Sequence, residues 1–212
     1  MKNNKFLLVS AMTVVATLSY LLWRGADIDC LECVLSLLCG SLAAALMIFL
    51  PVLYRNMAGN FVAYLCLGVI PAVVTSYIAA GAVYWSVLVV ALPLALLSDG
   101  IIHSVNTRNV LEGNQQASLA KALGAGASAK FYAFEMIFPF VWVAVLSMIG
   151  LMPVYTIVVF LAIAVALACA KTLNTIGADE TDIIGDIAER TANLHLMFSI
   201  LLSLSFIAAY FL

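Results

Sequence analysis

Seven long apolar stretches limit what this chain can fold into more than any other feature of its sequence. Each contains about 17–24 residues, enough for a helix that rises about 1.5 Å per residue to cross roughly 30 Å of hydrocarbon. The stretches are Phe6–Trp23, Leu31–Tyr54, Phe61–Gly81, Trp85–Val105, Tyr132–Leu151, Val154–Ala170 and Leu194–Leu212. They predict seven transmembrane helices.

The composition of the chain is that of a membrane protein. Hydrophobic residues make up 66% of the sequence and charged residues only 9%, whereas soluble domains carry about 25% charge. In lipid the backbone must satisfy its own hydrogen bonds, and the stretches are too long and too uniformly apolar for the alternating strands of a membrane barrel. We therefore expect an all-α polytopic helix bundle in which residues 1–212 form a single transmembrane domain.

The basic residues predict the orientation of the bundle. If the N-terminus is cytoplasmic, eight of the nine lysines and arginines lie on the cytoplasmic side, together with the long polar loops 106–130 and 171–193. The eight are Lys2, Lys5, Arg55, Arg108, Lys121, Lys130, Lys171 and Arg190, and the ninth is Arg24. We expect a multi-pass protein of the inner, cytoplasmic membrane. A net charge of −2 and scattered basic residues argue against a nucleic-acid partner.

Polar residues at the inner ends of two stretches are candidates for a binding site. Asp99 and His103 are four residues apart, so on a helix they share a face with Asn106. A carboxylate in a membrane segment is costly and usually faces a cavity or a partner. These residues predict either the polar wall of a headgroup pocket or an interfacial pair whose side chains reach water. Glu135 is expected to form an interfacial pair with Lys130.

The polar loop after the fourth stretch carries a motif with a known counterpart. Residues 106–124 read NTRNVLEGNQQASLAKALG, which places an asparagine, an arginine, a Ser-Leu-Ala step and a Leu-Gly pair in order. This order resembles the second signature of the UbiA superfamily of membrane prenyltransferases. The upstream YRNMAGN (54–60) and ALP (91–93) and the downstream TANLHLMF (191–198) are similar to the menaquinone-pathway branch, the dihydroxynaphthoate polyprenyltransferases. The similarity covers roughly residues 20–212.

The resemblance implies a reaction and a site. Family members transfer a polyprenyl chain from its diphosphate to an aromatic or quinone-like acceptor, with Mg²⁺ assisting departure of the diphosphate. The residues carried over to a catalytic remnant are Asn106, Arg108, Asn109 and Glu112. Those assigned to substrate binding are Tyr54, Arg55, Asn60, Asn114 and Lys121 by the resemblance, together with Asp99 and His103 of the polar helix face.

The chain differs from the family in two ways, in its number of helices and in its acidic residues. The family has nine transmembrane helices, and the match begins near its third, so the first two helices and the first Asp-rich motif are missing. A partner chain could supply them. Within the second motif, Asn109 stands at the first aspartate and Gly113 or Asn114 near the second, while Asn60 replaces the acid of the Y-R-x-x-G-E/D step.

These departures weaken the predicted metal site. Mg²⁺ is a hard cation held by carboxylates, phosphates and water, and an amide supplies no charge to it. Diphosphate departure needs positive charge, which a metal or basic side chains can provide. Glu112 and Asp99 are the nearby acids and thus the metal candidates. The prediction is weak binding of a metal diphosphate.

Three alternatives remain. One is a non-catalytic paralogue that binds a quinone, an isoprenoid or another membrane lipid, or that serves as a subunit of a membrane complex. Another is a replacement metal motif in which Asp182 and Asp186 lie four residues apart, although a solvated acidic loop is the simpler explanation. The last is a transporter, against which we count the lack of an inverted repeat and of charges near the stretch centres.

Overall fold

The chain folds into helices that run back and forth along one axis. The computed structural model describes residues 4–49, 56–114, 116–175 and 186–212, and this part contains helices and no strand. The helices are α1 (Asn4–Trp23), α2 (Cys30–Phe49), α3 (Gly59–Ala63), α4 (Ile70–Ala80), α5 (Trp85–Leu111), α6 (Leu119–Leu123), α7 (Ala125–Met148), α8 (Ile163–Thr175) and α10 (Ile187–Phe211). A π-helical turn, Tyr64–Val69, joins α3 to α4, and a 3₁₀ helix, Val154–Ala162, precedes α8.

The predicted all-α membrane bundle is confirmed. Seven described helical segments are long and apolar enough to cross a membrane, and each overlaps one of the seven apolar stretches. The chain is therefore a multi-pass membrane protein. The helix ends differ from the stretch ends, because a helix continues where its side chains become polar. Thus α5 extends to Leu111 instead of Val105, α7 begins at Ala125 instead of Tyr132, and α10 begins at Ile187 instead of Leu194.

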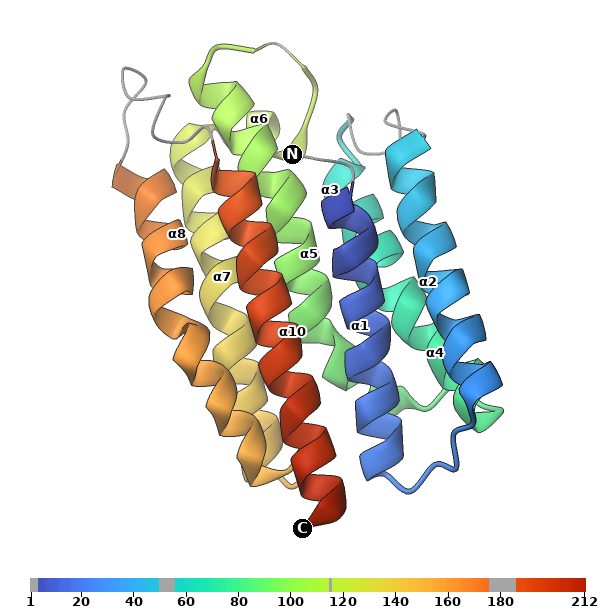
Figure 1. Cartoon of the computed structure of the whole chain (residues 1–212). Helices are drawn as coiled ribbons and strands as arrows, with labels where there is room; N and C mark the ends of the chain where they lie inside the picture. Colours follow the sequence, from blue (N-terminus) through green and yellow to red (C-terminus); the bar gives the residue numbers. More distant parts are fainter. Residues whose placement is uncertain (1–3, 50–55, 115, 176–185) are drawn as a thin grey trace.

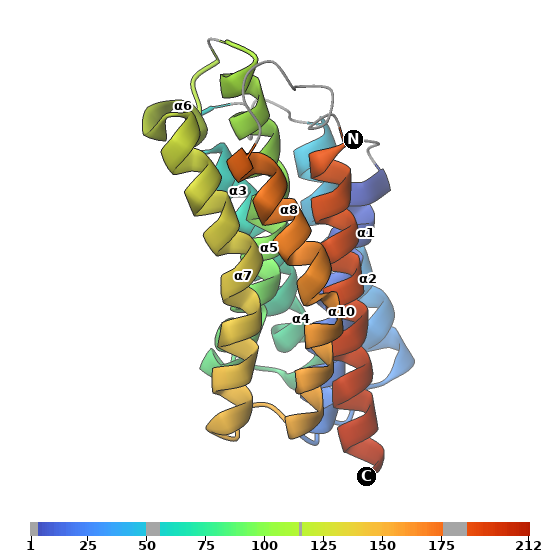
Figure 2. The ribbon, with the colours of Figure 1, turned by 90° about the vertical axis from the view of Figure 1, so that its left-hand side faces the viewer.

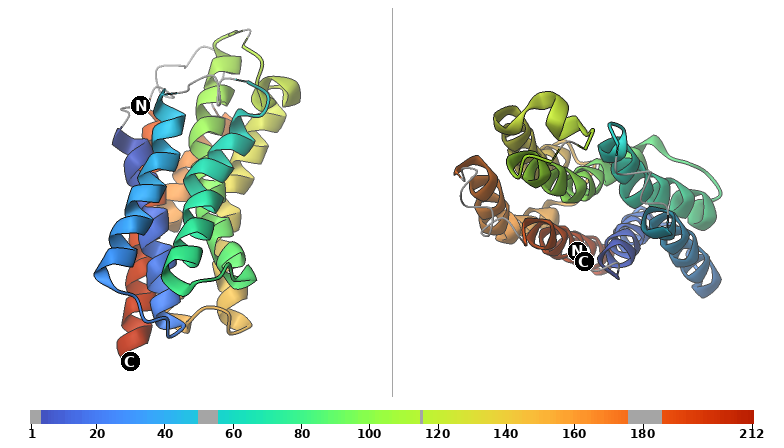
Figure 3. Two further views of the ribbon diagram at one scale, coloured as in Figure 1. Left: turned by 90° about the vertical axis from the view of Figure 1, so that its right-hand side faces the viewer. Right: turned by 90° about the horizontal axis from the view of Figure 1, so that it is seen from above.

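The long helices form two packed rows. One row contains α8, α10, α1 and α2, and the other contains α7, α5 and the α3–α4 segment (Figures 2 and 3). α5 packs against α7, α10 and the α3–α4 segment, so most of it is enclosed. Its buried side chains include polar ones that lipid would not tolerate. α5 is thus the helix on which a polar site can be built inside the bundle.

Close backbone contact holds the α3–α4 segment against α5. A Cβ added at Gly68 would lie 2.4 Å from the Cα of Ala95, so only glycine allows this approach. In the π-helical turn around Gly68, the backbone carbonyl groups do not follow the α-helical hydrogen-bond pattern. One of them, the Leu67 carbonyl, accepts a hydrogen bond from Thr13 Oγ1 of α1 at 2.9 Å. These contacts place α3, and with it Asn60, beside α5.

The two ends of the bundle differ in character. At one end lie the start of α1, the α5–α7 connection and the start of α10, and at the other lies the C-terminus (Figure 1). We call the first the loop end, marked by Asn4, Leu111 and Ile187, and the second the short-turn end, marked by Trp23 and Trp85. The described residues that flank the two loops predicted to be cytoplasmic, Leu111, Ala125, Thr175 and Ile187, thus lie at one end.

Candidate functional site: a buried polar cluster

Four of the predicted substrate-binding or catalytic residues meet inside the bundle. Asn60 comes from α3, whereas Asp99, His103 and Asn106 follow one another along one face of α5. All four side chains are buried, with at most 7% of any residue exposed. They lie next to Glu135 of α7, and we call these five residues the buried polar cluster. The prediction of a shared face on α5 is supported, and the interpretation of Asp99 and His103 as an interfacial pair is wrong.

Asn60 is the centre of the hydrogen bonds in this cluster. Its Nδ2 lies 2.8 Å from Asp99 Oδ1 and 3.0 Å from His103 Nδ1, so both of its amide hydrogens are used. Its Oδ1 accepts from Asn106 Nδ2 at 3.3 Å. Because His103 Nδ1 accepts a hydrogen bond, the ring proton belongs on Nε2. The contacts thus assign a neutral His103 with its donor directed to α7.

Ser128 receives this donor and joins α5 to α7. His103 Nε2 lies 3.1 Å from the Ser128 carbonyl and 2.9 Å from its Oγ. The same Oγ is 2.6 Å from Thr107 Oγ1, which also donates to the His103 carbonyl. All three side chains are fully buried. A chain of hydrogen bonds therefore crosses from α3 through α5 to α7 without reaching water.

Glu135 is the exception in this satisfied network. Its side chain is fully buried, and among the described residues its polar neighbour is the Asp99 carboxyl group, with which it shares a hydrogen bond when one of the two carries a proton. The closest cationic candidate is His103 Nδ1, 3.6 Å from Oε1, which already accepts from Asn60. Burying two neighbouring carboxyl groups costs free energy, which makes Glu135 and Asp99 candidates for a function.

The expected pairing of Glu135 with Lys130 is wrong. Lys130 is exposed, and it forms no ion pair among the residues that the structure covers. The two residues are five positions apart, which places them about 140° from one another around the helix. Glu135 faces the bundle instead, where the bare Gly100 leaves room, since a Cβ there would lie 3.6 Å from Glu135 Oε2.

The two carboxyl groups lie deep in the membrane-spanning region. α5 runs from residue 85 to 111, so its centre is residue 98, and Asp99 is next to it. α7 runs from 125 to 148, and Glu135 is within two residues of its centre. The statement that no charge lies near a segment centre is therefore wrong, and that argument against a transporter is withdrawn.

The rest of the predicted site lies at the loop end, away from the cluster. Arg108 Nε binds Glu112 Oε1 at 2.7 Å, one turn apart on α5. The Asn109 carbonyl accepts from the backbone of Asn114, an exposed residue, at 2.8 Å. Lys121 is exposed on the short α6. Two further predicted residues, Tyr54 and Arg55, lie outside the described residues.

The metal candidates do not share a site. Asp99 and Glu112 are 13 residues apart on one helix, or roughly 20 Å along its axis. In the described ranges, no group of three or more His, Cys, Asp or Glu is arranged to hold a metal ion. Asp186 binds Arg190 Nε at 2.9 Å, and Asp182 lies outside the described residues. The donors thus do not fit the Mg²⁺ that the resemblance implies.

Comparisons with known proteins add no assignment. No protein-family model matches the chain, and neither does any curated protein or any solved structure. The motif resemblance and the geometry of the buried polar cluster therefore carry the functional argument alone.

An aromatic ladder leads away from the cluster along α7. The ring centroids of His103 and Phe131 are 5.2 Å apart, and the ladder continues through Phe134, Phe138 and Trp142 at 6.1, 4.8 and 5.6 Å. Phe131 and Phe134 are 37% and 46% exposed, so the ladder faces outward. Sequence reasoning missed this ladder and the role of Glu135. The spacing of the aromatic residues, three or four positions apart, was the available signal.

Proposed function

We propose that this chain is a UbiA-like membrane protein that binds a polyprenyl lipid, and that its reaction is transfer of the prenyl chain from its diphosphate to an aromatic acceptor. One observation carries the proposal. Asn60 and Asn106, chosen from a motif resemblance, meet Asp99 and His103, chosen from their spacing on a helix, in one buried cluster, although Asn60 is at least 39 residues from the other three. Any membrane bundle brings its buried polar residues together, and the proposal is supported because two of those that meet here were named by the motif resemblance.

The two parts of the site suit the two parts of such a substrate pair. The aromatic ladder of α7 offers an apolar track for an isoprenoid chain, whose repeated double bonds pack well against rings. In this proposal the Glu135 carboxyl group, which lies beside the Asp99 carboxyl group, bonds a hydroxyl of the acceptor ring. In the proposed reaction the allylic C–O bond breaks, the diphosphate leaves with the electron pair, and a C–C bond forms to the ring. The ring then loses a proton to a base, for which Glu135 is the candidate.

The charge for the leaving diphosphate must come from basic residues. Arg108 and Lys121 lie at the loop end, and Arg108 is nine residues, or about 14 Å along α5, from Asp99 of the cluster. Because the described carboxylates do not fit a magnesium site, we derive no step through a metal. A partner chain that carries the family's first two helices would complete the machinery, and we propose that it packs on this bundle.

The decisive experiment is a transfer assay with the purified full chain in lipid. Polyprenyl diphosphate and dihydroxynaphthoate are supplied with and without Mg²⁺, and the prenylated product is measured by mass spectrometry. We expect product that is lost in Glu135→Gln and retained in Lys171→Gln, which changes an exposed residue outside the site. Absence of product under all conditions, from folded protein, would contradict transfer.

Binding without transfer is the second candidate, and one observation favours it. The acid nearest the loop motif, Glu112, is already paired with Arg108, and amides stand where the family has acids. A binding protein predicts that solvent extraction of the purified chain releases a quinone or isoprenoid, although the transfer assay yields no product. Loss of that lipid in His103→Leu would locate it at the cluster.

The membrane sidedness belongs to the same proposal. We propose an inner-membrane location with the loop end in the cytoplasm and Arg24 outside. Cys30 is exposed at the short-turn end and offers a native reporter. A membrane-impermeant maleimide should label it in spheroplasts, with Cys30→Ser as the control. Labelling only in inverted vesicles would reverse the orientation.

A further inference from the structure

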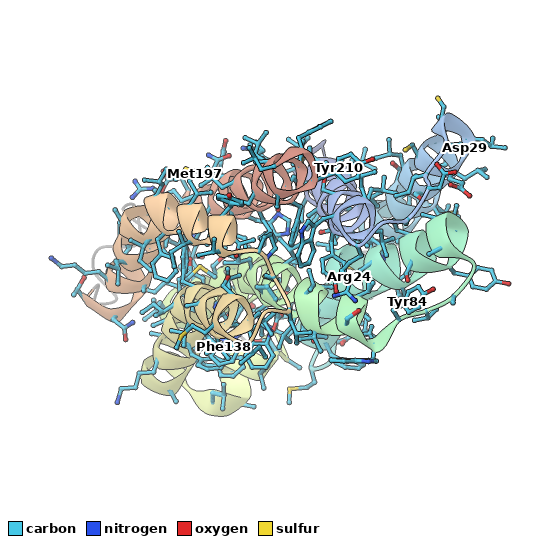
Figure 4. The ribbon with its side chains drawn as sticks, turned by 90° about the horizontal axis from the view of Figure 1, so that it is seen from below. Arg24, Asp29, Tyr84, Phe138, Met197 and Tyr210 are labelled. Carbon is cyan, nitrogen blue, oxygen red and sulfur yellow. The ribbon has the colours of Figure 1, made fainter. Side chains whose placement is uncertain are left out.

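A cavity opens at the short-turn end, far from the buried polar cluster. Its volume is about 480 Å³, within the range of small-ligand sites. It lies between the end of α1 and the start of α5 and is lined by Arg24 and Tyr84, which lie near each other when the bundle is seen from this end (Figure 4). Tyr20, Asp27 and Ser86 also line it.

The cavity contains one cation and one anion that do not bind each other. α1 ends at Trp23, and Gly25, with φ +86°, turns the chain so that Arg24 and Asp27 both face the cavity. Neither forms an ion pair within the described part of the chain. The Arg24 guanidinium lies 5.8 Å from the Trp23 ring centroid, which holds it near the membrane interface. Both charges are thus free to take a ligand of opposite sign.

Two further groups add donors on the same cavity. Tyr20 is 1% exposed, and its hydroxyl has no hydrogen-bond partner among the described residues. The N-terminus of α5 has no side-chain cap and no acidic residue in its first turn, where Ser86 lies. The unbonded N–H groups of such a helix start attract anions. Tyr20, Arg24 and the start of α5 therefore suit an anionic group, while Asp27 suits an ammonium.

The depth of the cavity indicates where such a ligand comes from. Trp23, Tyr84, Trp85 and Tyr210 all lie at the short-turn end, as aromatic residues do where a membrane meets water. A cavity at this level is open to the headgroups of the surrounding lipid. Phosphate and ammonium occur together in the most common zwitterionic headgroups.

We propose that this cavity is a binding site for a phosphoethanolamine group, supplied by a membrane phospholipid. The phosphate lies against Arg24, the Tyr20 hydroxyl and the start of α5, and the ammonium lies against Asp27. The site is independent of the prenyl chemistry at the loop end. It would hold one lipid in place at the short turns between α1 and α2 and between α4 and α5.

The test measures lipid binding by the full chain in nanodiscs. Phosphatidylethanolamine is compared with phosphatidylglycerol, which lacks the ammonium, by native mass spectrometry. We expect Arg24→Gln to weaken binding of phosphatidylethanolamine about tenfold, since one charge-assisted contact is lost. Lys171→Gln removes an exposed cation from the other end and should change nothing. Asp27→Asn should abolish the preference for phosphatidylethanolamine over phosphatidylglycerol.

Several outcomes would overturn the site. Equal binding of both lipids by the unchanged chain would contradict the proposed contact between Asp27 and the ammonium group. Unchanged binding in both Arg24→Gln and Tyr20→Phe, with melting temperatures like that of the unchanged chain, would remove the site altogether. Free phosphoethanolamine is added as a competitor, and displacement of the lipid by it would support the same chemistry with a soluble source. Failure of prenyl transfer would not affect any of these results.

Discussion

The buried polar cluster and the polar loop around Asn114 both contain asparagines, but the asparagines bond to distant residues in the cluster and to near neighbours in the loop. In the cluster, the side-chain amide of Asn60 donates hydrogen bonds to Asp99 and His103, which belong to another helix. In the loop, Asn114 Oδ1 accepts from the backbone of Gln116, two residues away. Water is available to the loop and absent from the cluster, so only the cluster needs partners that are distant in sequence. A polar residue inside an apolar stretch therefore says more about function than a polar residue between stretches.

The largest effect is expected from a change that separates the two sides of the cluster. Gly68→Ala would place a Cβ 2.4 Å from the Ala95 backbone, which cannot move aside as a flexible side chain could. We expect a loss of about 3 kcal/mol in the free energy of unfolding, measured by SDS titration. Gly126→Ala is the matched control, because a Cβ there meets nothing within 4 Å. Equal effects of both would show that the close approach to α5 is unimportant.

A smaller loss is expected from removing the hub of the cluster. Asn60→Ala leaves Asp99 Oδ1 and His103 Nδ1 without their donor. The expected cost is about 2 kcal/mol, since hydrogen bonds inside membrane proteins contribute modestly and unpaired buried groups add to the loss. Asn114→Ala in the loop should change the free energy of unfolding by less than about 0.5 kcal/mol. Similar changes in the free energy of unfolding for the two variants would show that the cluster and the loop contribute equally to stability.

Glu135 should separate stability from function. Glu135→Gln keeps the shape of the side chain, and its amide can donate to the neighbouring Asp99 carboxyl group, so we expect a change of at most about 1 kcal/mol in the free energy of unfolding. Binding of the polyprenyl lipid or its acceptor should nevertheless fall about tenfold. A variant that unfolds readily but binds normally would make Glu135 a structural residue.

The smallest effect is expected at the loop end. The Arg108–Glu112 pair is partly exposed, with 37% and 33% of the two side chains accessible. A double-mutant cycle with Arg108→Ala and Glu112→Ala should give a coupling below about 1 kcal/mol. A coupling of several kcal/mol would place this pair in a dry environment and move the working site toward the loop.

The fold was predictable because apolar length alone decides it. Seven stretches of the right length predicted seven spans. The predicted and observed ends differ only by a few residues, as at the end of α5, where polar side chains continue the helix. The order of helices in the two rows was not predictable. It depends on contacts such as that of Gly68 with Ala95, whose 27-residue separation no local pattern encodes.

Four residues of the buried polar cluster could be predicted from the sequence, but the fifth, Glu135, could not. The spacing of Asp99 and His103 placed them on one face, and the motif resemblance drew in Asn60 and Asn106. Glu135 was assigned to Lys130 because Lys130 is its nearest cation along the chain. Which way a side chain points around a helix depends on the packing of that helix, and α7 presents Glu135 to α5.

The neighbourhood of the first and last helices has a consequence for how the protein is made. α1 packs along α10, and Lys5 reaches Glu189 at 3.3 Å, so residues at opposite ends of the chain complete one layer. During synthesis α1 enters the membrane long before α10 exists. Its inward side, including the buried Thr13 and Tyr20, must meanwhile rest against other helices, lipid or an insertion factor. A nascent chain stopped before residue 187 should therefore remain bound to the insertion machinery, and crosslinking from α1 would reveal what protects it.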